Sequence, residues 1–194
     1  DRTRETALRV SDVANHDLTY EKKQELNLGV QVGFFKNRIN LAADWYTRNN
    51  YDLIGRVPTQ GLSGNILRMG NVASMHSYGV DLSLETQNIK TKNFSWTTTF
   101  IYAKNENRIT ELYVDASIND MVNGSGFSKQ GYPVGSIFSI PFRGLNSDGL
   151  PTFSDPNGNT TIDGIRFDER NNLGFLQYSG TTKPTDVGSI GNLF

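Results

Sequence analysis

The chain has 194 residues with 19 basic and 20 acidic side chains, a net charge of −1 and no cysteine. This balance of charge is not typical of proteins that bind nucleic acid electrostatically, and without cysteine there are neither disulfides nor thiol chemistry. No apolar run approaches the ~20 residues of a membrane-spanning helix, which argues against a helical membrane protein but not against a β-barrel, whose strands hide half their residues from lipid.

The first predicted elements form a β-hairpin. Apolar residues alternate with small or polar ones through "NLGVQVGFFKNRINLAADWY", which predicts strands over about 21–34 and 38–48. Residues 36–38 are expected to make the tight connection between these strands. One face of this hairpin is then apolar and uncharged, and the other face is polar or small.

Two further strands are predicted after a long, polar and Gly-rich connection over about 49–76. They cover about 77–86 in "SYGVDLSLET" and 94–103 in "FSWTTTFIYA", with "QNIKTKN" as the short connection between them. A second long connection is expected over about 105–186, where turn signals such as "NGSG", "NSDG" and "DPNGN" recur. The final "VGSIGNLF" is suited to begin another strand.

The alternation alone leaves open whether the apolar face meets lipid or a protein core. Strands of about ten residues, tilted by ~45°, rise about 24 Å, close to the ~25 Å apolar band of outer-membrane barrels, whereas soluble strands have about five or six residues. Short and long connections also alternate, as they do in such barrels. We therefore predict an all-β fold, an antiparallel transmembrane β-barrel. The alternative is a soluble β-sandwich module that binds carbohydrate.

In a barrel, the polar face lines the lumen or contacts a plug domain. The residues predicted to lie on this face are Asn27, Gln31, Asn40, Asp44, Tyr46, Asp81 and Glu85. Aromatic residues of the second long connection are candidates for contact with a substrate or partner, namely Tyr132, Phe138, Phe142 and Phe153. The favoured interpretation of these rings is that they pack the connection against itself.

The sequence contains one weak candidate for a metal site. In "DPNGNTTIDGIR" the spacing of calcium ligands is met by Asp155, Asn157, Asn159 and Asp163. However, Thr160 replaces the usual glycine and Arg166 the usual bidentate glutamate, so a turn is the favoured prediction. The carboxylates of this connection form no identifiable acid–base pair, and neither enzymatic activity nor a cofactor is expected.

Several of these stretches resemble the SusC/RagA family of TonB-dependent outer-membrane transporters, known from Bacteroidetes. The resemblance covers most of the chain, in family order. It is carried by "DLTYEKKQELNLGVQVGFFKNRINLAADWYTRNNYDLI", "GNVASMHSYGVDLSLET", "GYPVGSIFSIPFRGLNSDGLPTF" and "GTTKPTDVGSIGNLF". Two positions depart from the family pattern: His16, where proline is usual, and Ser189, where a second glycine is usual.

The resemblance implies that residues 1–194 are a C-terminal part of one barrel domain of ~22 strands, with the plug domain outside this sequence. Residues 49–76 and 105–186 would then be extracellular loops. It also implies a place in the bacterial outer membrane and the import of oligosaccharides or peptides. The implied partners are a SusD-like surface lipoprotein, TonB acting through the plug, and outer-membrane lipid, with no nucleic acid.

Overall fold

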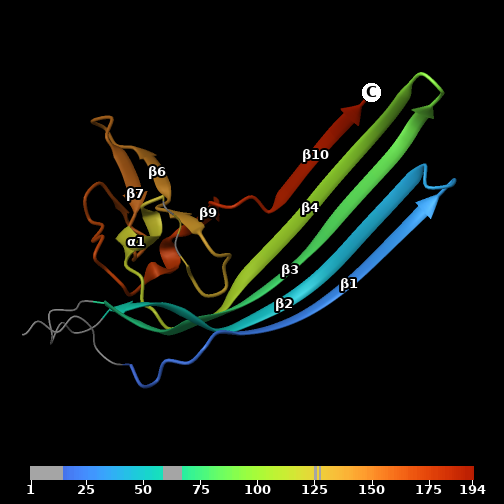
Figure 1. The fold of residues 1–194 in the computed structure, drawn as a ribbon. Coiled ribbons are helices and arrows are strands. Elements are labelled where there is room, and N and C mark those ends of the chain that lie inside the picture. The colour runs from blue at the N-terminus through green and yellow to red at the C-terminus, as the bar shows by residue number, and fades with distance from the viewer. Residues whose placement is uncertain (1–14, 59–66, 125, 127) are drawn as a thin grey trace, which may run out of the picture.

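The chain folds around one long antiparallel sheet with the strand order β1-β2-β3-β4-β10. This computed structural model describes residues 15–58, 67–124, 126 and 128–194. The strands of the sheet are β1 (Lys22–Phe34), β2 (Ile39–Pro58), β3 (Leu67–Lys90), β4 (Ser95–Leu112) and β10 (Asp186–Leu193). Figure 1 shows that they lie side by side in a curved sheet whose outer strands are β1 and β10. Among the described residues, no helix is long and apolar enough to cross a membrane.

The hairpin turns lie where the sequence predicts them. Between β1 and β2, residues 35–37 all have positive φ, and the Arg38 amide donates to the Phe34 carbonyl at 3.0 Å. Between β3 and β4, the Thr91 amide donates to the Phe94 carbonyl at 2.8 Å. Both short turns therefore lie at the same end of the sheet. The strand predicted from "VGSIGNLF" is also present, as β10.

The strands are longer than the sequence indicates, and the prediction of a long loop over 49–76 is wrong. Strand β2 continues to Pro58 and β3 begins at Leu67, with pairs such as Leu53↔Ala73 and Gly55↔Gly70. Residues 59–66 lie outside the described residues. The strand propensity of a segment depends on its neighbours, so a polar, Gly-rich segment forms a strand where a partner strand continues beside it.

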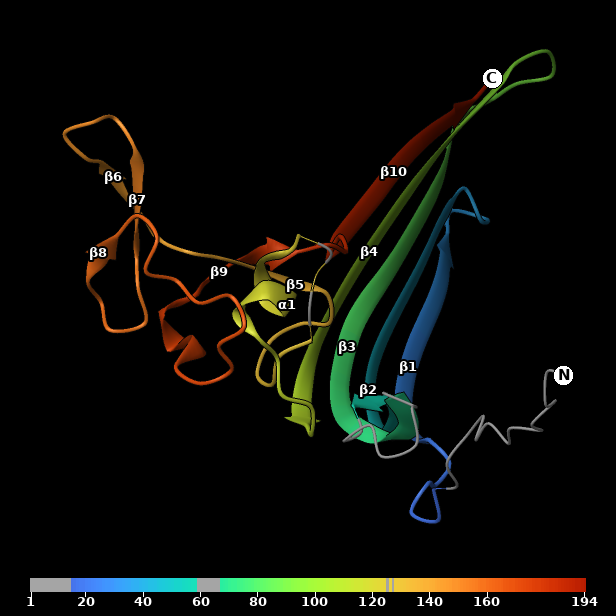
Figure 2. The same cartoon turned by 90° about the vertical axis from the view of Figure 1, so that its left-hand side faces the viewer.

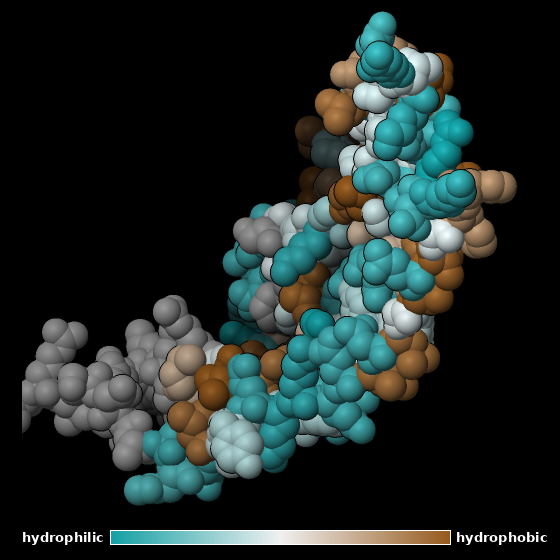
Figure 3. Space-filling model, turned by 45° about the vertical axis from the view of Figure 1, so that its right-hand side comes forward, coloured by the Kyte–Doolittle hydropathy of each residue, from teal (hydrophilic) through white to brown (hydrophobic). Residues whose placement is uncertain are grey.

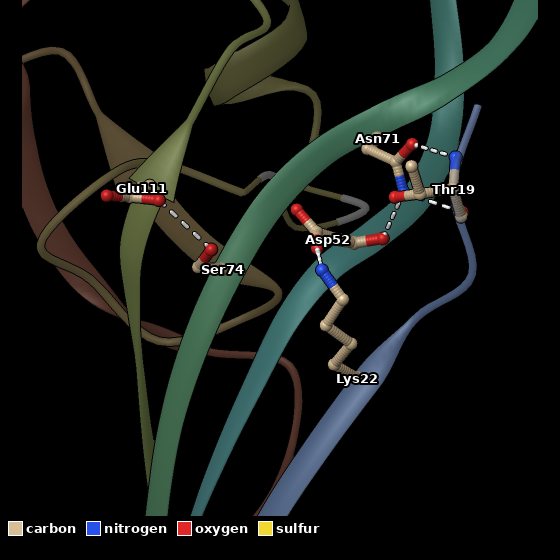
Figure 4. A network of polar contacts seen from close by, with 6 residues as sticks. All are labelled: Thr19, Lys22, Asp52, Asn71, Ser74 and Glu111. Atoms are coloured by element: carbon tan, nitrogen blue, oxygen red, sulfur yellow. Dashed lines mark hydrogen bonds and ion pairs between the residues drawn. The ribbon is translucent and has the colours of Figure 1, made fainter. Parts of the chain in front are cut away.

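A β-bulge distorts the ladder at the end of the sheet opposite the hairpin turns. The register of β2 and β3 shifts on both sides of Leu53, and Asp52 has a φ of 57°. The Lys22 ammonium lies 2.8 Å from the Asp52 carboxylate, and the side-chain amide of Asn71 donates to the Asp52 backbone carbonyl at 2.5 Å. Asn71 also exchanges hydrogen bonds with the backbone of Thr19 (Figure 4). These contacts fix the segment before β1 against the bulge.

Residues 113–185 form a small subdomain beside the sheet (Figures 1 and 2). Its elements are α1 (Ile118–Val122), β5 (Ser136–Ser139), β6 (Phe142–Leu145), β7 (Pro151–Ser154), β8 (Thr160–Thr161), a 3-10 turn (Leu173–Phe175) and β9 (Gln177–Thr181). The core consists of Ile118, Met121, Phe138 and Leu176. The second predicted connection therefore begins later than residue 105, because β4 continues to Leu112, and it has a core of its own.

The subdomain attaches to the part of β4 that extends beyond β10. The Ile109 amide donates to the Tyr132 carbonyl at 3.0 Å, and the Gly131 amide donates to the Ile109 carbonyl at 2.8 Å. The Val134 amide donates to the Asn107 side chain at 2.8 Å. Residues 131–134 thus take the place of a neighbouring strand along this part of β4 and position the subdomain over the sheet.

Candidate functional site

The pairing of the strands separates apolar from polar side chains onto two faces. The apolar face is formed by Leu28, Val30, Val32, Phe34, Ile39, Leu41, Ala43, Trp45, Val80, Leu82, Leu84, Phe100 and Tyr102, which are paired with one another across the ladder. No residue of this set is charged. Figure 3 shows hydrophilic side chains in a strip along the sheet, with hydrophobic side chains gathered beside it.

The apolar face is not covered by a protein core within the described residues. Leu28 is 59% exposed and Val30 is 56% exposed, although both belong to the middle of β1. A contiguous exposed apolar surface of this kind marks contact with a membrane or a partner. On β1 it extends from Leu26 to Phe34, which at a ~45° tilt corresponds to a rise of about 20 Å.

Polar pairs mark the end of the apolar face toward the subdomain. The Lys104 ammonium lies 2.9 Å from the Glu106 carboxylate, and the Tyr102 hydroxyl donates to Asp186 at 2.6 Å. The Tyr78 hydroxyl also donates to Glu106. Lys104 lies opposite Val80 and Glu106 lies opposite Tyr78, so charged groups begin on β4 at the level of Val80, as expected at a boundary between lipid and water.

The residues predicted to share the polar face do so. The register places Asn27 opposite Tyr46, Asn40 opposite Glu85 and Asp44 opposite Asp81, while Gln31 lies opposite Ala42 on the same face. That this face lines a lumen stays a prediction. Asp44 and Asp81 form a like-charged pair, and neither carboxylate has a basic partner among the described residues.

Tyr46 crosses the polar face and links β2 to β4. Its hydroxyl accepts a hydrogen bond from the Asn105 side chain at 2.6 Å. It can reach Asn105 because the intervening residue on β3 is Gly79, where an added Cβ would lie 2.4 Å from the Tyr46 hydroxyl. The Arg48 guanidinium lies 5.5 Å from the Tyr46 ring centre and donates two hydrogen bonds to Glu25, 3.1 and 3.2 Å long. Glu25, Arg48, Tyr46 and Asn105 therefore form a connected network across the polar face from β1 to β4.

Two adjoining cavities lie where the polar face meets the subdomain. The first, termed the polar cavity, has a volume of about 570 Å³, and its walls include Arg48, Ser77, Asn105, Asn107, Tyr178 and Lys183. The second, termed the apolar cavity, has a volume of about 310 Å³ and is lined by Leu53, Val72, Ile109, Leu112, Val114 and Val134, among others. Met75 and Val134 line both, so the cavities lie side by side.

The aromatic candidates of the subdomain fall into two pairs. Phe138 is only 2% exposed and belongs to the core, with Tyr132 packed against it at a ring-centre distance of 5.1 Å. The Lys129 ammonium lies 5.0 Å from the Phe138 ring centre, and burial lowers the pKa of Lys129 below its usual value. Phe138 is therefore a packing residue, which agrees with the favoured interpretation and argues against its candidacy as a contact for substrate. Phe142 and Phe153 pair at 6.1 Å, and Phe142 is 59% exposed.

Of the calcium candidates, Asp155, Asn157 and Asn159 lie in the turn between β7 and β8, and Asp163 follows β8. One oxygen of the Asp155 carboxylate accepts hydrogen bonds from the amides of Asn157 and Asn159, 2.9 and 2.7 Å long. The other oxygen accepts from the Asn159 side chain at 3.1 Å. The carboxylate thus stabilises the turn. Over the described ranges, no group of three His, Cys, Asp or Glu residues is placed to hold a metal ion.

Sequence reasoning missed the two cavities and the residues that line them. Arg48 is the last residue of a predicted strand, and Ile109 and Lys183 lie in an expected loop, so nothing in the local pattern singles them out. They come together because residues 131–134 attach to β4. The one usable signal was the alternation itself, which continues through Asn105 and Asn107 on the polar face.

The chain is similar to curated TonB-dependent receptors over most of its length. SusC of Bacteroides thetaiotaomicron is 31% identical over 77% of this chain and 16% of that protein. TonB-dependent receptor P3 of Formosa agariphila is 26% identical over 80% of this chain and 16% of that protein. The chain therefore spans only 16% of these relatives' length. No family model matches it.

Solved structures show the same arrangement of strands. The RagAB peptide importer in its closed-closed state aligns with a TM-score of 0.77 and 25% identity, over 98% of this chain and 21% of that chain. The structure of the RagAB peptide transporter aligns with a TM-score of 0.74 over 93% of this chain and 20% of that chain. This agreement confirms the predicted fold class, in which the antiparallel sheet is part of a larger barrel.

Proposed function

We propose that the chain forms part of the wall of an outer-membrane nutrient importer. This proposal follows because the chain belongs, over the segment that it covers, to the SusC/RagA family of TonB-dependent receptors. The relatives are named as receptors, transporters and importers rather than enzymes. We assign the segment no catalytic role. Its work in transport is to separate lipid from a polar passage and to shape the extracellular end of that passage.

The observation that carries this proposal is the exposed, uncharged apolar face lying directly behind a polar face. Lipid explains why residues such as Leu28 and Val30 stay exposed without a covering core. It also explains why Lys104 and Glu106 appear as soon as the apolar face ends. A soluble sandwich would instead pack a second sheet against this face.

We infer the partners and substrates of the intact protein from what the similar proteins are described to do. RagAB is described as a peptide transporter and SusC as a TonB-dependent receptor. We infer that the intact protein imports oligosaccharides or peptides, with a SusD-like lipoprotein over the barrel and TonB acting through a plug domain. The short hairpin turns then lie on the periplasmic side, and the subdomain lies on the extracellular side.

Cysteine labelling of the intact protein in outer-membrane vesicles tests this orientation. Neighbouring positions on one strand serve as matched controls: Val30→Cys against Gln31→Cys, and Leu82→Cys against Asp81→Cys. With a water-requiring thiol reagent, we expect Gln31→Cys and Asp81→Cys to react. Val30→Cys and Leu82→Cys should react only after detergent is added. If they stay unreactive in detergent, a protein core covers them and the soluble sandwich becomes the better interpretation.

Uptake by cells tests the transport step separately. Cells that carry the gene for the intact protein should take up labelled oligosaccharide or peptide, and cells lacking the gene should not. Dissipating the proton-motive force should stop uptake while leaving surface binding intact. Uptake that continues without the proton-motive force would contradict a TonB-dependent mechanism.

A further inference from the structure

The polar and apolar cavities together form a site with two kinds of wall. The apolar cavity is lined almost wholly by aliphatic side chains, with Ser128 as its one hydroxyl-bearing residue and no aromatic ring. Its volume of about 310 Å³ is large enough for one or two amino-acid side chains. The polar cavity next to it has a volume of about 570 Å³ and opens between the sheet and the subdomain.

The polar cavity offers amide groups that are only partly used. Asn105 donates through its NH₂ group to Tyr46, which leaves its carbonyl oxygen for a ligand. Asn107 accepts through its carbonyl oxygen from the Val134 amide, which leaves its NH₂ group. A donor and an acceptor at successive positions on the same face of one strand match the alternating donors and acceptors of a peptide backbone.

One cationic side chain that lines the polar cavity has no ionic partner among the described residues. Arg48 is paired with Glu25, and Glu106 with Lys104. The exposed Lys183 ammonium has neither a hydrogen bond nor an ion pair among the described residues. An uncompensated cation beside free amide groups favours a ligand that carries a carboxylate.

We propose that these cavities bind a peptide, with an apolar side chain in the apolar cavity and a carboxylate near Lys183. This inference rests on the proposed import function and names the substrate class for it. An oligosaccharide fits poorly because its hydroxyl groups would lie against aliphatic walls without hydrogen-bond partners. Sugars are also usually held on exposed aromatic rings, and no aromatic residue lines the apolar cavity.

Direct binding to the purified intact protein tests the apolar half of the site. Two hexapeptides that differ only by leucine or asparagine at one position are titrated by calorimetry. We expect the leucine peptide to bind about tenfold more tightly, which is the effect of burying one such side chain. Val134→Asp should abolish this preference, and Ala73→Leu, which fills the cavity without adding charge, should weaken it. Leu145→Asp, at an exposed site outside the cavities, should leave it unchanged.

The carboxylate half of the site has its own matched pair of variants. We expect peptides with a free C-terminus to bind more tightly than C-terminally amidated ones. Lys183→Gln should remove this difference, while Lys92→Gln, in the hairpin at the opposite end of the sheet, should retain it. Equal binding of the leucine and asparagine peptides by the wild type would overturn the proposal. So would a neutral oligosaccharide whose affinity falls with Val134→Asp.

The two proposals fail in different ways. Proton-motive uptake of an oligosaccharide without binding of either peptide would leave the import function standing and refute the peptide site. Loss of uptake for every substrate, with peptide binding intact, would refute import while keeping the site. The mobility of each variant on a denaturing gel, with and without heating, reports whether the variant has folded. A variant that does not fold is replaced by another variant of the same half of the site, for example Val134→Asp by Ala73→Leu.

Discussion

At the scale of single residues, the polar face depends on small side chains that let large ones cross it. Gly79 is the clearest case. The Tyr46 ring passes over this glycine to reach Asn105, and an added Cβ would also lie 2.5 Å from the Lys104 carbonyl oxygen. Because a backbone carbonyl moves little, the site accepts no larger residue without distortion. A tyrosine over a glycine thus joins three strands into one rigid unit.

Gly79→Ala should therefore destabilise the intact protein by about 1–3 kcal/mol, the usual effect of overpacking. The measurement is the temperature at which the folded form is lost on a denaturing gel. Gly191→Ala is the matched control, because it lies in β10 and an added Cβ there meets open space. Equal effects of the two substitutions would contradict the role given to Tyr46.

At the scale of elements, the short helix α1 owes its position to its capping box. The Ser117 hydroxyl caps the Asp120 amide, and the Asp120 carboxylate accepts from the Ser117 amide at 2.9 Å. The Ser117 amide first, and then the Ser117 hydroxyl at 2.7 Å, donate to this carboxylate and hold the pKa of Asp120 below its usual value of 3.8. Ile118 and Met121 can then enter the core of the subdomain, although a five-residue helix is not stable alone.

The contribution of the Asp120 carboxylate to the free energy of unfolding should be fully present above pH 4. It should be lost as the pH falls below 3.8, the ordinary pKa that applies in the unfolded state, and through the lower pKa of the folded state. The sign follows because a depressed carboxyl pKa favours the folded state only when the group is ionised. Hydrogen exchange of the peptide that spans α1 measures this loss. Ser117→Ala should reduce protection by about 1 kcal/mol even at neutral pH, and Asn119→Ala, at an exposed site, should not. Protection independent of pH would contradict this account.

Strand β1 provides the most direct energetic test of the two faces. Val30→Lys places a charge in the middle of the apolar face and should destabilise the protein in lipid by about 2–4 kcal/mol. Gln31→Lys, one residue further on the polar face, should change stability by less than about 1 kcal/mol. Denaturant unfolding of the intact protein in vesicles measures both. If Gln31→Lys is the more harmful, the assignment of the faces is reversed.

At the scale of the whole molecule, the sheet is incomplete by itself. Strands β1 and β10 each pair on one side only within the described residues, and the exposed apolar face lies between these two open edges. Unpaired backbone groups are not tolerated in lipid, so both edges need neighbouring strands. The relatives, of which this chain spans a small part, are long enough to supply them.

Residues 15–194 expressed alone should consequently fail to form a soluble monomer. We expect aggregation in buffer, since the segment exposes both strand edges and an apolar face. Size-exclusion chromatography and circular dichroism measure this, with the intact protein in detergent as the control. A monodisperse, soluble β-sheet protein would favour the soluble-sandwich alternative.

The local sequence pattern was sufficient to predict those structural features that repeat every two residues. Alternation through residues 27–46 determines which side chains share a face, and it correctly grouped Asn27, Asp44 and Asp81 with one another. It also located the hairpin turns, because turn residues act through their own φ and ψ. The continuation of β2 and β3 was missed, since pairing of a polar segment depends on the strand beside it and not on its own propensity.

The sequence by itself determined that this protein has long strands with an apolar and a polar face, and its resemblance to the SusC/RagA family placed it in the outer membrane. Only the tertiary structure decided that residues 131–134 pair with β4 and that Phe138 is buried. It alone brings Arg48, Asn107 and Lys183 around one cavity. The physical reason is distance along the chain: a face follows from neighbouring residues, whereas a cavity is formed by segments that meet only after folding.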